Sequence, residues 1–77
     1  MELDKAFGVI LRELRNAQGY SQEELAEKLG ACSHSHICRL ESGQKTPKLD
    51  MIFRLSEALG ISPCVMIQLV EEKHKHE

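Results

Sequence analysis

The sequence has 77 residues, which is enough for one small domain but too short for a second domain or a deep catalytic cavity. With 42% hydrophobic and 29% charged residues, the composition is that of a folded globular protein and excludes a chain that is disordered throughout. The formal net charge of -2 excludes a uniformly basic surface, so any affinity for a polyanion must come from an uneven distribution of charge.

The first two predicted helices are marked by an apolar stripe and by a helix start signal. Apolar residues recur at i, i+3, i+4 and i+7 from Phe7 to Leu14, which predicts an amphipathic helix over about residues 4–18. Gly19 is suited to end it. The run Ser21-Gln22-Glu23-Glu24 is typical of a capping box, so a second short helix is predicted from there to Gly30.

A third short helix is predicted to begin at Ser33, the best N-cap in this region, and to end at Gly43. Its only large apolar residues, Ile37 and Leu40, lie three positions apart. Because so narrow a stripe buries little surface, the rest of this helix must face water or a partner. The segment over residues 42–48, which contains glycine and proline, predicts a loop.

Two more helices are predicted, from Leu49 to Leu59 and from Pro63, with Ser62 as its cap. The fifth helix is apolar on more than one face, which fits contact with both the core and a second subunit. We expect the domain to span residues 1–72, with a charged tail over 73–77 that frays. The predicted core consists of ten apolar residues: Phe7, Ile10, Leu14, Leu25, Leu29, Ile37, Leu40, Ile52, Leu55 and Leu59. The predicted dimer interface consists of four residues of the fifth helix: Val65, Met66, Leu69 and Val70.

The combined pattern resembles the Cro and phage-repressor type, or Xre-like, helix-turn-helix family over about residues 5–67. The segments that carry the resemblance are, in chain order, Phe7-Gly8, Leu11 to Arg15, Gly19 to Gly30, Ser33 to Ile37, Arg39 to Gly43, Thr46 to Leu49 and Leu55 to Ser62. The sequence departs from the family by one extra residue in the turn Gly30-Ala31-Cys32, which affects the crossing angle of the second and third helices.

This resemblance implies an all-α, five-helix, lambda-repressor-like domain whose second and third helices form the helix-turn-helix. It implies sequence-specific binding to double-stranded DNA as a transcriptional regulator, with repression as the simplest outcome. Together with the apolar fifth helix, it predicts a homodimer on a roughly palindromic operator with half-sites ~34 Å apart.

The outward face of the third helix follows from helical geometry alone. With Ile37 and Leu40 inward, a rotation of ~100° per residue turns Ser35, Cys38, Arg39 and Ser42 outward, with His34 at the exposed N-terminal end. The residues expected to contact bases are His34, Ser35, Cys38 and Arg39. Arg39 can donate two hydrogen bonds to O6 and N7 of a guanine. The residues expected to contact phosphates are Gln22, at the start of the second helix, and Ser42, Gln44, Lys45 and Lys48.

Glu41 is predicted to lie in the last turn of the third helix, where the helix dipole disfavours a negative charge. It therefore needs a cation or a hydrogen-bond donor. The family resemblance pairs it with Arg15 of the first helix. We expect this ion pair to be structural and to fix the third helix to the scaffold.

Two alternatives remain at this level. The run Cys32-Ser33-His34-Ser35-His36-Ile37-Cys38 contains four side chains of the metal-binding type, which suggests a metal- or redox-responsive variant. On a helix only His34 and Cys38 would share a face, so we expect no metal and no cofactor. The other alternative is a helix-turn-helix scaffold that acts mainly through protein contacts, as an antitoxin or a regulator of another factor; the negative net charge favours it.

Several other classes of function find no support in the sequence. It contains no glycine-rich phosphate loop, HExxH or GxSxG motif, so an enzyme is not expected. No stretch approaches the ~20 apolar residues of a membrane span, and the first residues lack the order of a signal peptide. We expect a cytoplasmic protein with reduced thiols, no membrane partner and no small-molecule substrate.

Overall fold

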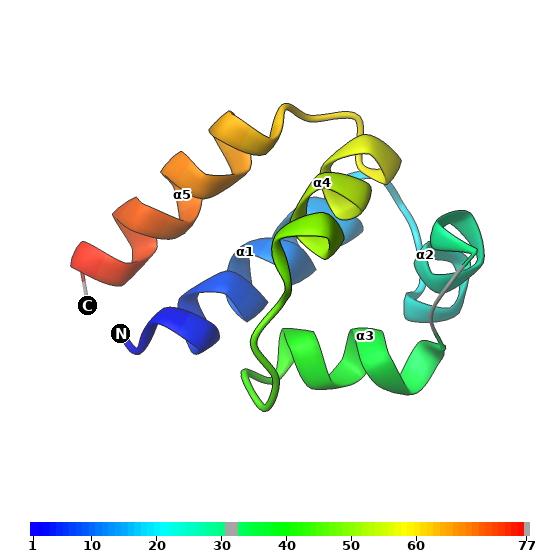
Figure 1. Cartoon of the computed structure of the whole chain (residues 1–77), viewed down its shortest axis with the longest axis horizontal. Coiled ribbons are helices and arrows are strands. Elements are labelled where there is room, and N and C mark those ends of the chain that lie inside the picture. Colours follow the sequence, from blue (N-terminus) through cyan, green and yellow to red (C-terminus); the bar gives the residue numbers. More distant parts are fainter. Residues whose placement is uncertain (31–32, 77) are drawn as a thin grey trace.

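Five helices make up the computed structural model, which describes residues 1–30 and 33–76 (Figure 1). They are α1 (Leu3–Ala17), α2 (Gln22–Leu29), α3 (His34–Glu41), α4 (Leu49–Ala58) and α5 (Pro63–Lys75). The described residues contain no strand, and the all-α, five-helix architecture predicted from the sequence is confirmed. Two residues of the turn with the predicted insertion, Ala31 and Cys32, lie outside the described residues.

Local side-chain signals set the starts of three helices. The Ser21 hydroxyl accepts a hydrogen bond from the Glu24 backbone at 3.0 Å, and the Glu24 carboxylate accepts one from the Ser21 backbone at 2.8 Å. The predicted capping box of α2 is therefore present. Ser33 caps α3 by accepting from the backbone of the third helical residue, and Pro63 occupies the first position of α5. These starts agree with the sequence prediction.

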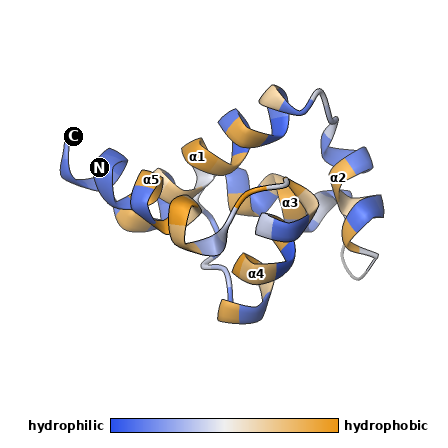
Figure 2. Cartoon of the chain, turned by 90° about the horizontal axis from the view of Figure 1, so that it is seen from above, coloured by the Kyte–Doolittle hydropathy of each residue, from blue (hydrophilic) through white to orange (hydrophobic). Residues whose placement is uncertain are grey.

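The long helix α1 is the element against which both α3 and α5 pack (Figure 1). The helix α2 contacts α3 and α4, and α4 contacts α5 in turn. Figure 2 shows hydrophobic and hydrophilic residues alternating along the helices, as expected for elements with one buried side. In the described part of the chain no single helix could span a membrane; α4 and α5 would qualify only as a pair, and they meet at a bend of 107°.

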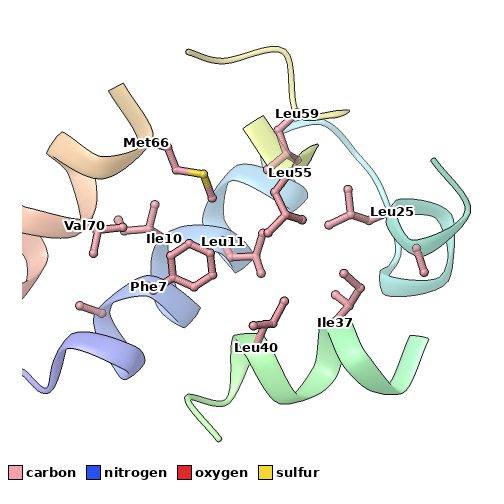
Figure 3. Packing of buried hydrophobic residues seen from close by; sticks show 12 residues of the cluster. Phe7, Ile10, Leu11, Leu25, Ile37, Leu40, Leu55, Leu59, Met66 and Val70 are labelled. Carbon is pink, nitrogen blue, oxygen red and sulfur yellow. The ribbon is translucent and has the colours of Figure 1, made fainter. Parts of the chain in front are cut away.

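The core draws apolar side chains from all five helices (Figure 3). Seven of the ten predicted core residues are buried, whereas Leu14, Leu29 and Ile52 pack only partly buried against the edge of the core. The predicted core list left out Leu11, which belongs to the predicted apolar stripe of the first helix and is fully buried. The buried apolar residues are Ala6, Phe7, Ile10, Leu11, Leu25, Ala26, Ile37, Leu40, Leu55, Leu59, Met66 and Val70.

The structure corrects the prediction that Met66 and Val70 of α5 lie at the surface. Met66 and Val70, expected at a dimer interface, are 0% and 5% exposed because this face of α5 packs along α1 within the same protomer. Val65 and Leu69 lie at the surface, exposed and half-buried respectively. The segment expected to fray from residue 73 is helical to Lys75, and the Lys73 ammonium lies 3.7 Å from the Glu13 carboxylate of α1.

The backbone of α1 comes unusually close to the end of α3 at Gly8. A Cβ added to Gly8 would lie 2.7 Å from the Leu40 carbonyl oxygen and would overlap the Glu41 carbonyl. Backbone atoms cannot move aside as a flexible side chain can, so the close approach depends on glycine. The position of α3 relative to α1 is therefore set in part by the lack of a side chain.

Candidate nucleic-acid interface

The side chains predicted to contact bases lie on the solvent face of α3. His34, Ser35, Cys38 and Arg39 are all exposed, as the helical geometry predicted. On the opposite side of the helix, Ile37 and Leu40 are fully buried in the core. The polar side of α3 is thus free to meet a partner while its apolar side anchors it.

The residues predicted to contact phosphates after α3 are also exposed: Ser42, Gln44, Lys45 and Lys48. The chain reverses here through Gly43, whose φ of 80° is favourable only for glycine. The Gln44 backbone N–H donates to the Arg39 carbonyl at 3.0 Å, which ties the loop to the end of α3.

The corner where α3 meets this loop carries a local excess of positive charge, and this charge affects the pKa of His36. Partial burial lowers the pKa of His36, and the nearby charges of Lys45 and Arg39 lower it further. Sequence reasoning gave His36 no role outside the possible metal run. Both effects favour the neutral imidazole, and the positive charges that His36 faces are those of Lys45 and Arg39.

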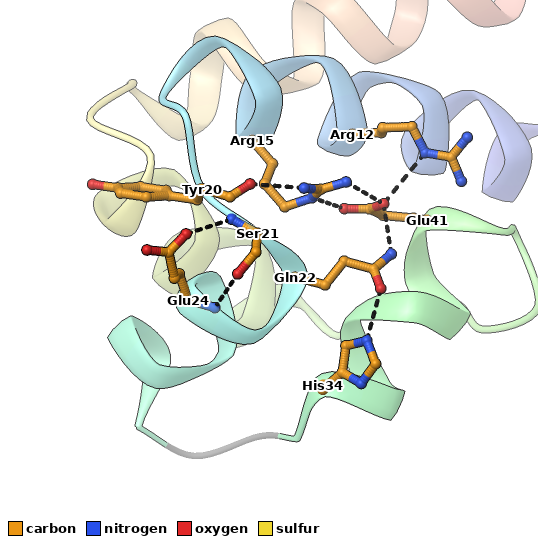
Figure 4. A network of polar contacts seen from close by, with 8 residues as sticks. All are labelled: Arg12, Arg15, Tyr20, Ser21, Gln22, Glu24, His34 and Glu41. Carbon is orange, nitrogen blue, oxygen red and sulfur yellow. Dashed lines mark hydrogen bonds and ion pairs between the residues drawn. The ribbon is translucent and has the colours of Figure 1, made fainter.

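A network of hydrogen bonds converges on the Glu41 carboxylate; we call Arg12, Arg15, Gln22, His34 and Glu41 the Glu41 network (Figure 4). The Arg15 guanidinium donates from Nε to Oε2 at 2.5 Å and from Nη2 to Oε1 at 3.1 Å. Oε1 also accepts from Gln22 Nε2 at 3.0 Å and from Arg12 Nε at 3.3 Å. The side chain of Glu41 is completely buried.

The chemistry of this network keeps Glu41 ionised. Burial alone would raise its pKa, but hydrogen bonds from Arg15, Gln22 and Arg12 and the charge of Arg15 outweigh burial, so the pKa is lowered. Arg15 and Glu41 are the two residues that the family resemblance pairs, and Arg15 Nη1 also donates to the Tyr20 carbonyl at 2.7 Å. A single carboxylate thus joins α1, α2 and α3.

Gln22 lies inside this network rather than free at the surface. Its Nε2 donates to Glu41, and its Oε1 lies 2.9 Å from His34 Nε2. The side chain therefore links the end of α3 to its beginning. A phosphate contact at this position would use its backbone N–H, at the start of α2, and the second hydrogen of its amide nitrogen.

Arg12 belongs to the same surface and was missed by sequence reasoning. Its side chain is 56% exposed, and only its Nε contacts Glu41, so the two terminal nitrogens are turned away from that carboxylate (Figure 4). The sequence did contain one sign of this role. Arg12 precedes Arg15 by three positions, so the two side chains lie on the same side of α1. This places another cation beside the start of α2.

The possible metal run is not assembled by the part of the chain that the structure describes. Within residues 1–30 and 33–76, no group of three histidine, cysteine or acidic side chains is arranged to hold a metal ion. Cys38 is a free, exposed thiol, while Cys32 lies outside the described residues.

Comparison with known proteins places this arrangement in a family. The family described as "Helix-turn-helix" matches residues 11–65, which is most of the chain, so the chain belongs to the helix-turn-helix family. A curated relative from Sinorhizobium fredii, "Uncharacterized HTH-type transcriptional regulator y4dJ", is 29% identical over 94% of this chain and 92% of its own length.

Two solved structures share the fold. The restriction-modification controller protein C.AhdI from Aeromonas hydrophila is 41% identical with a TM-score of 0.78, covering 82% of this chain and 90% of that one. The clp gene regulator ClgR from C. glutamicum is 28% identical with a TM-score of 0.86, covering 94% and 92%. The family resemblance stated from the sequence is confirmed.

Proposed function

We propose that this protein is a transcriptional regulator that binds double-stranded DNA with sequence specificity. The observation that carries the proposal is the two-sided character of α3, whose inner side is buried with Ile37, Leu40 and Glu41 and whose outer side is polar and exposed. An α-helix with its side chains is about 10 to 12 Å in diameter, and the major groove is about 12 Å wide, so the exposed side of α3 can enter it. The regulators ClgR and C.AhdI, as their names describe them, support the same function.

In this proposal the contacts divide into base reading and phosphate binding. Arg39 donates two hydrogen bonds to a guanine, and His34, Ser35 and Cys38 contact neighbouring base edges. We add Arg12 to the phosphate-binding group because its side chain is exposed and its terminal nitrogens do not contact Glu41. That group consists of Arg12, Gln22, Ser42, Gln44, Lys45 and Lys48.

The protein acts as a homodimer in this proposal, through apolar side chains that the protomer leaves exposed. Leu49 and Phe53 of α4 are 72% and 57% exposed, and Ile67 of α5 is 45% exposed. Isolated exposed apolar residues are ordinary, but five large ones on so small a domain favour a second copy. We call this set the apolar surface: Leu3, Leu49, Phe53, Val65 and Ile67. It replaces Met66 and Val70 in the predicted interface.

Promoter occlusion is the simplest mode of regulation, since it requires only occupancy of the operator. The rival role, a scaffold that acts through protein contacts, is favoured by the net charge of -2. The basic corner of Arg39 and Lys45 beside an exposed helix face favours DNA instead. A binding role without catalysis is consistent with the regulators named among its relatives.

The decisive experiment is selection of bound duplexes from random DNA, followed by titration of the selected site by fluorescence anisotropy. Contacts to six or more phosphates should cost about a thousandfold in affinity between about 50 and 200 mM salt. A scrambled duplex of equal length is the control. If the purified protein binds no duplex even at low salt, the DNA-binding proposal is wrong and the scaffold role takes its place.

A further inference from the structure

Gln22 connects a buried carboxylate to an exposed side chain at the start of α3. Its Nε2 lies 3.0 Å from Glu41 Oε1, and its Oε1 lies 2.9 Å from His34 Nε2 (Figure 4). A glutamine amide has one end that only donates and one that only accepts. The chain of bonds from Glu41 to His34 therefore has a direction, which the identities of its members determine.

The direction is set at Glu41. Its side chain is fully buried and accepts from Arg15 and Arg12, so it is an ionised carboxylate with no hydrogen to donate. The group of Gln22 that faces it must therefore be the NH2. The opposite amide orientation would place two oxygens in contact with no hydrogen between them. The amide oxygen of Gln22 must face His34.

An amide oxygen cannot donate, so the hydrogen between the two side chains belongs to His34 Nε2. A neutral imidazole carries one N–H, which leaves Nδ1 as an acceptor. Figure 4 shows the second ring nitrogen of His34 on the far side from Gln22. His34 is exposed in the first turn of α3, and no partner for this nitrogen is found among the described side chains.

We propose that Gln22 holds His34 in the tautomer with hydrogen on Nε2, so that His34 accepts a hydrogen bond from the exocyclic amino group of adenine or cytosine. In the major groove only these two bases present an amino donor, whereas guanine and thymine present oxygen acceptors at the corresponding position. Gln22 is then a positioning residue that sets base preference without touching a base. This inference rests on the proposed DNA-binding function and deepens it.

The chain offers a substitution that should invert the effect. In Gln22→Lys the ammonium can donate both to Glu41 and to His34 Nε2, which moves the imidazole hydrogen to Nδ1. His34 would then donate toward the groove and favour guanine or thymine. Gln22→Leu, which can neither donate nor accept, is the matched control and should leave a mixture of the two tautomers.

The tautomer can be measured without DNA by 15N NMR of histidine-labelled protein at pH 8, above the pH range in which imidazoles ordinarily take up a second proton. The expected result is a protonated Nε2 and an unprotonated Nδ1 for His34, reversed in Gln22→Lys. A protonated Nδ1 or an even mixture in the unmodified protein would overturn the proposal. Because the unmodified protein answers the question directly, the test survives if a variant fails to fold.

Base preference is read by comparing duplexes with all four bases at each half-site position. We expect one position at which adenine or cytosine is favoured about 5- to 10-fold, with the preference lost in His34→Ala and moved to guanine or thymine in Gln22→Lys. A His34-dependent preference for guanine or thymine in the unmodified protein would overturn the inference. Loss of all sequence preference would instead overturn the proposed function, with the NMR result unaffected.

Discussion

Two regions of this domain differ in what they bury and what they expose. The Glu41 network buries a charge where α1, α2 and α3 meet and surrounds it with donors, and every buried side-chain polar atom among the described residues has a partner. Elsewhere, α1, α4 and α5 form an apolar groove whose lining includes Leu3, Ile52 and Ile67. One region hides polar groups and the other displays apolar ones.

This difference in chemistry suits each region to its proposed task. Hydrogen bonds are directional, so the Glu41 network can fix the orientation of α3 and of the side chains at its start. Apolar contact is not directional and scales with the area removed from water, so the apolar surface suits association with a second copy. The predictions that follow test this division, from the largest expected effect to the smallest.

Arg15→Ala should have the largest effect, because it leaves the buried Glu41 carboxylate without its main partner. Removing one member of a buried pair costs about 3 to 5 kcal/mol, and the Arg15 side chain is only 12% exposed. The free energy of unfolding from urea titration measures it. Arg12→Ala is the matched control and should cost less than about 1 kcal/mol, since that side chain is 56% exposed. Equal losses would contradict a network centred on Arg15.

Phe53→Asp should weaken the proposed dimer and leave the protomer folded. A charge at an apolar contact should raise the dimer dissociation constant at least about thirtyfold, or ~2 kcal/mol. Sedimentation equilibrium measures the constant, and circular dichroism checks the fold. Arg54→Ala, at an exposed position of the same helix, is the control. An unchanged dissociation constant would remove Phe53 from the interface.

Arg39→Ala should weaken operator binding by ~1 to 3 kcal/mol and relax the preference at one base pair per half-site. Stability should stay nearly unchanged because Arg39 is exposed and lies outside the core. Lys48→Ala is the comparison, with a smaller loss that is equal on all sequences, as expected of a phosphate contact. If Arg39→Ala shows the same sequence-independent loss, Arg39 binds a phosphate instead.

The smallest effect concerns pH. The pKa of Glu41 is lowered in the folded state from its ordinary value of 4.5, so at pH values between the two the unfolded state binds more protons. Stability from this group is therefore complete above pH 4.5 and is lost as the pH falls through the lowered value. Urea titrations at several acidic pH values should show a shallower loss in Glu41→Gln. An identical pH profile would indicate that other carboxylates control acid unfolding.

Much of the fold followed from short-range signals in the sequence. Ser21, Ser33 and Pro63 mark helix starts because caps act within one turn, and the spacing of Ile37 and Leu40 alone oriented α3. Periodicity was insufficient for α5, where apolar residues lie on more than one face. Which of those faces turns inward depends on the packing of α1 against it, so Met66 and Val70 were assigned to the wrong surface.

The candidate site was predictable in its outer positions but not in its interior. The exposure of Arg39 needs only the helical repeat, whereas the contact of Gln22 with Glu41 joins residues 19 positions apart, and that of Arg12 joins residues 29 apart. No local sequence pattern indicates contacts between residues so far apart in the chain. The family resemblance supplied the pair of Arg15 and Glu41, and the structure supplied the contacts of Gln22 and Arg12 with Glu41.

The close approach of α1 to α3 at Gly8 belongs to the inner side of α3, and the inner and outer sides of this helix differ in which substitutions they can accept. Among the described residues, the contacts that hold this helix in place act on its inner side or at its two ends, through Ile37, Leu40, Glu41, the contact of Gln22 with His34 and the bare backbone of α1. The outer positions, such as Ser35 and Arg39, take no part in that attachment. New side chains could therefore be grafted there to address other operator sequences, while position 8 would tolerate no such change.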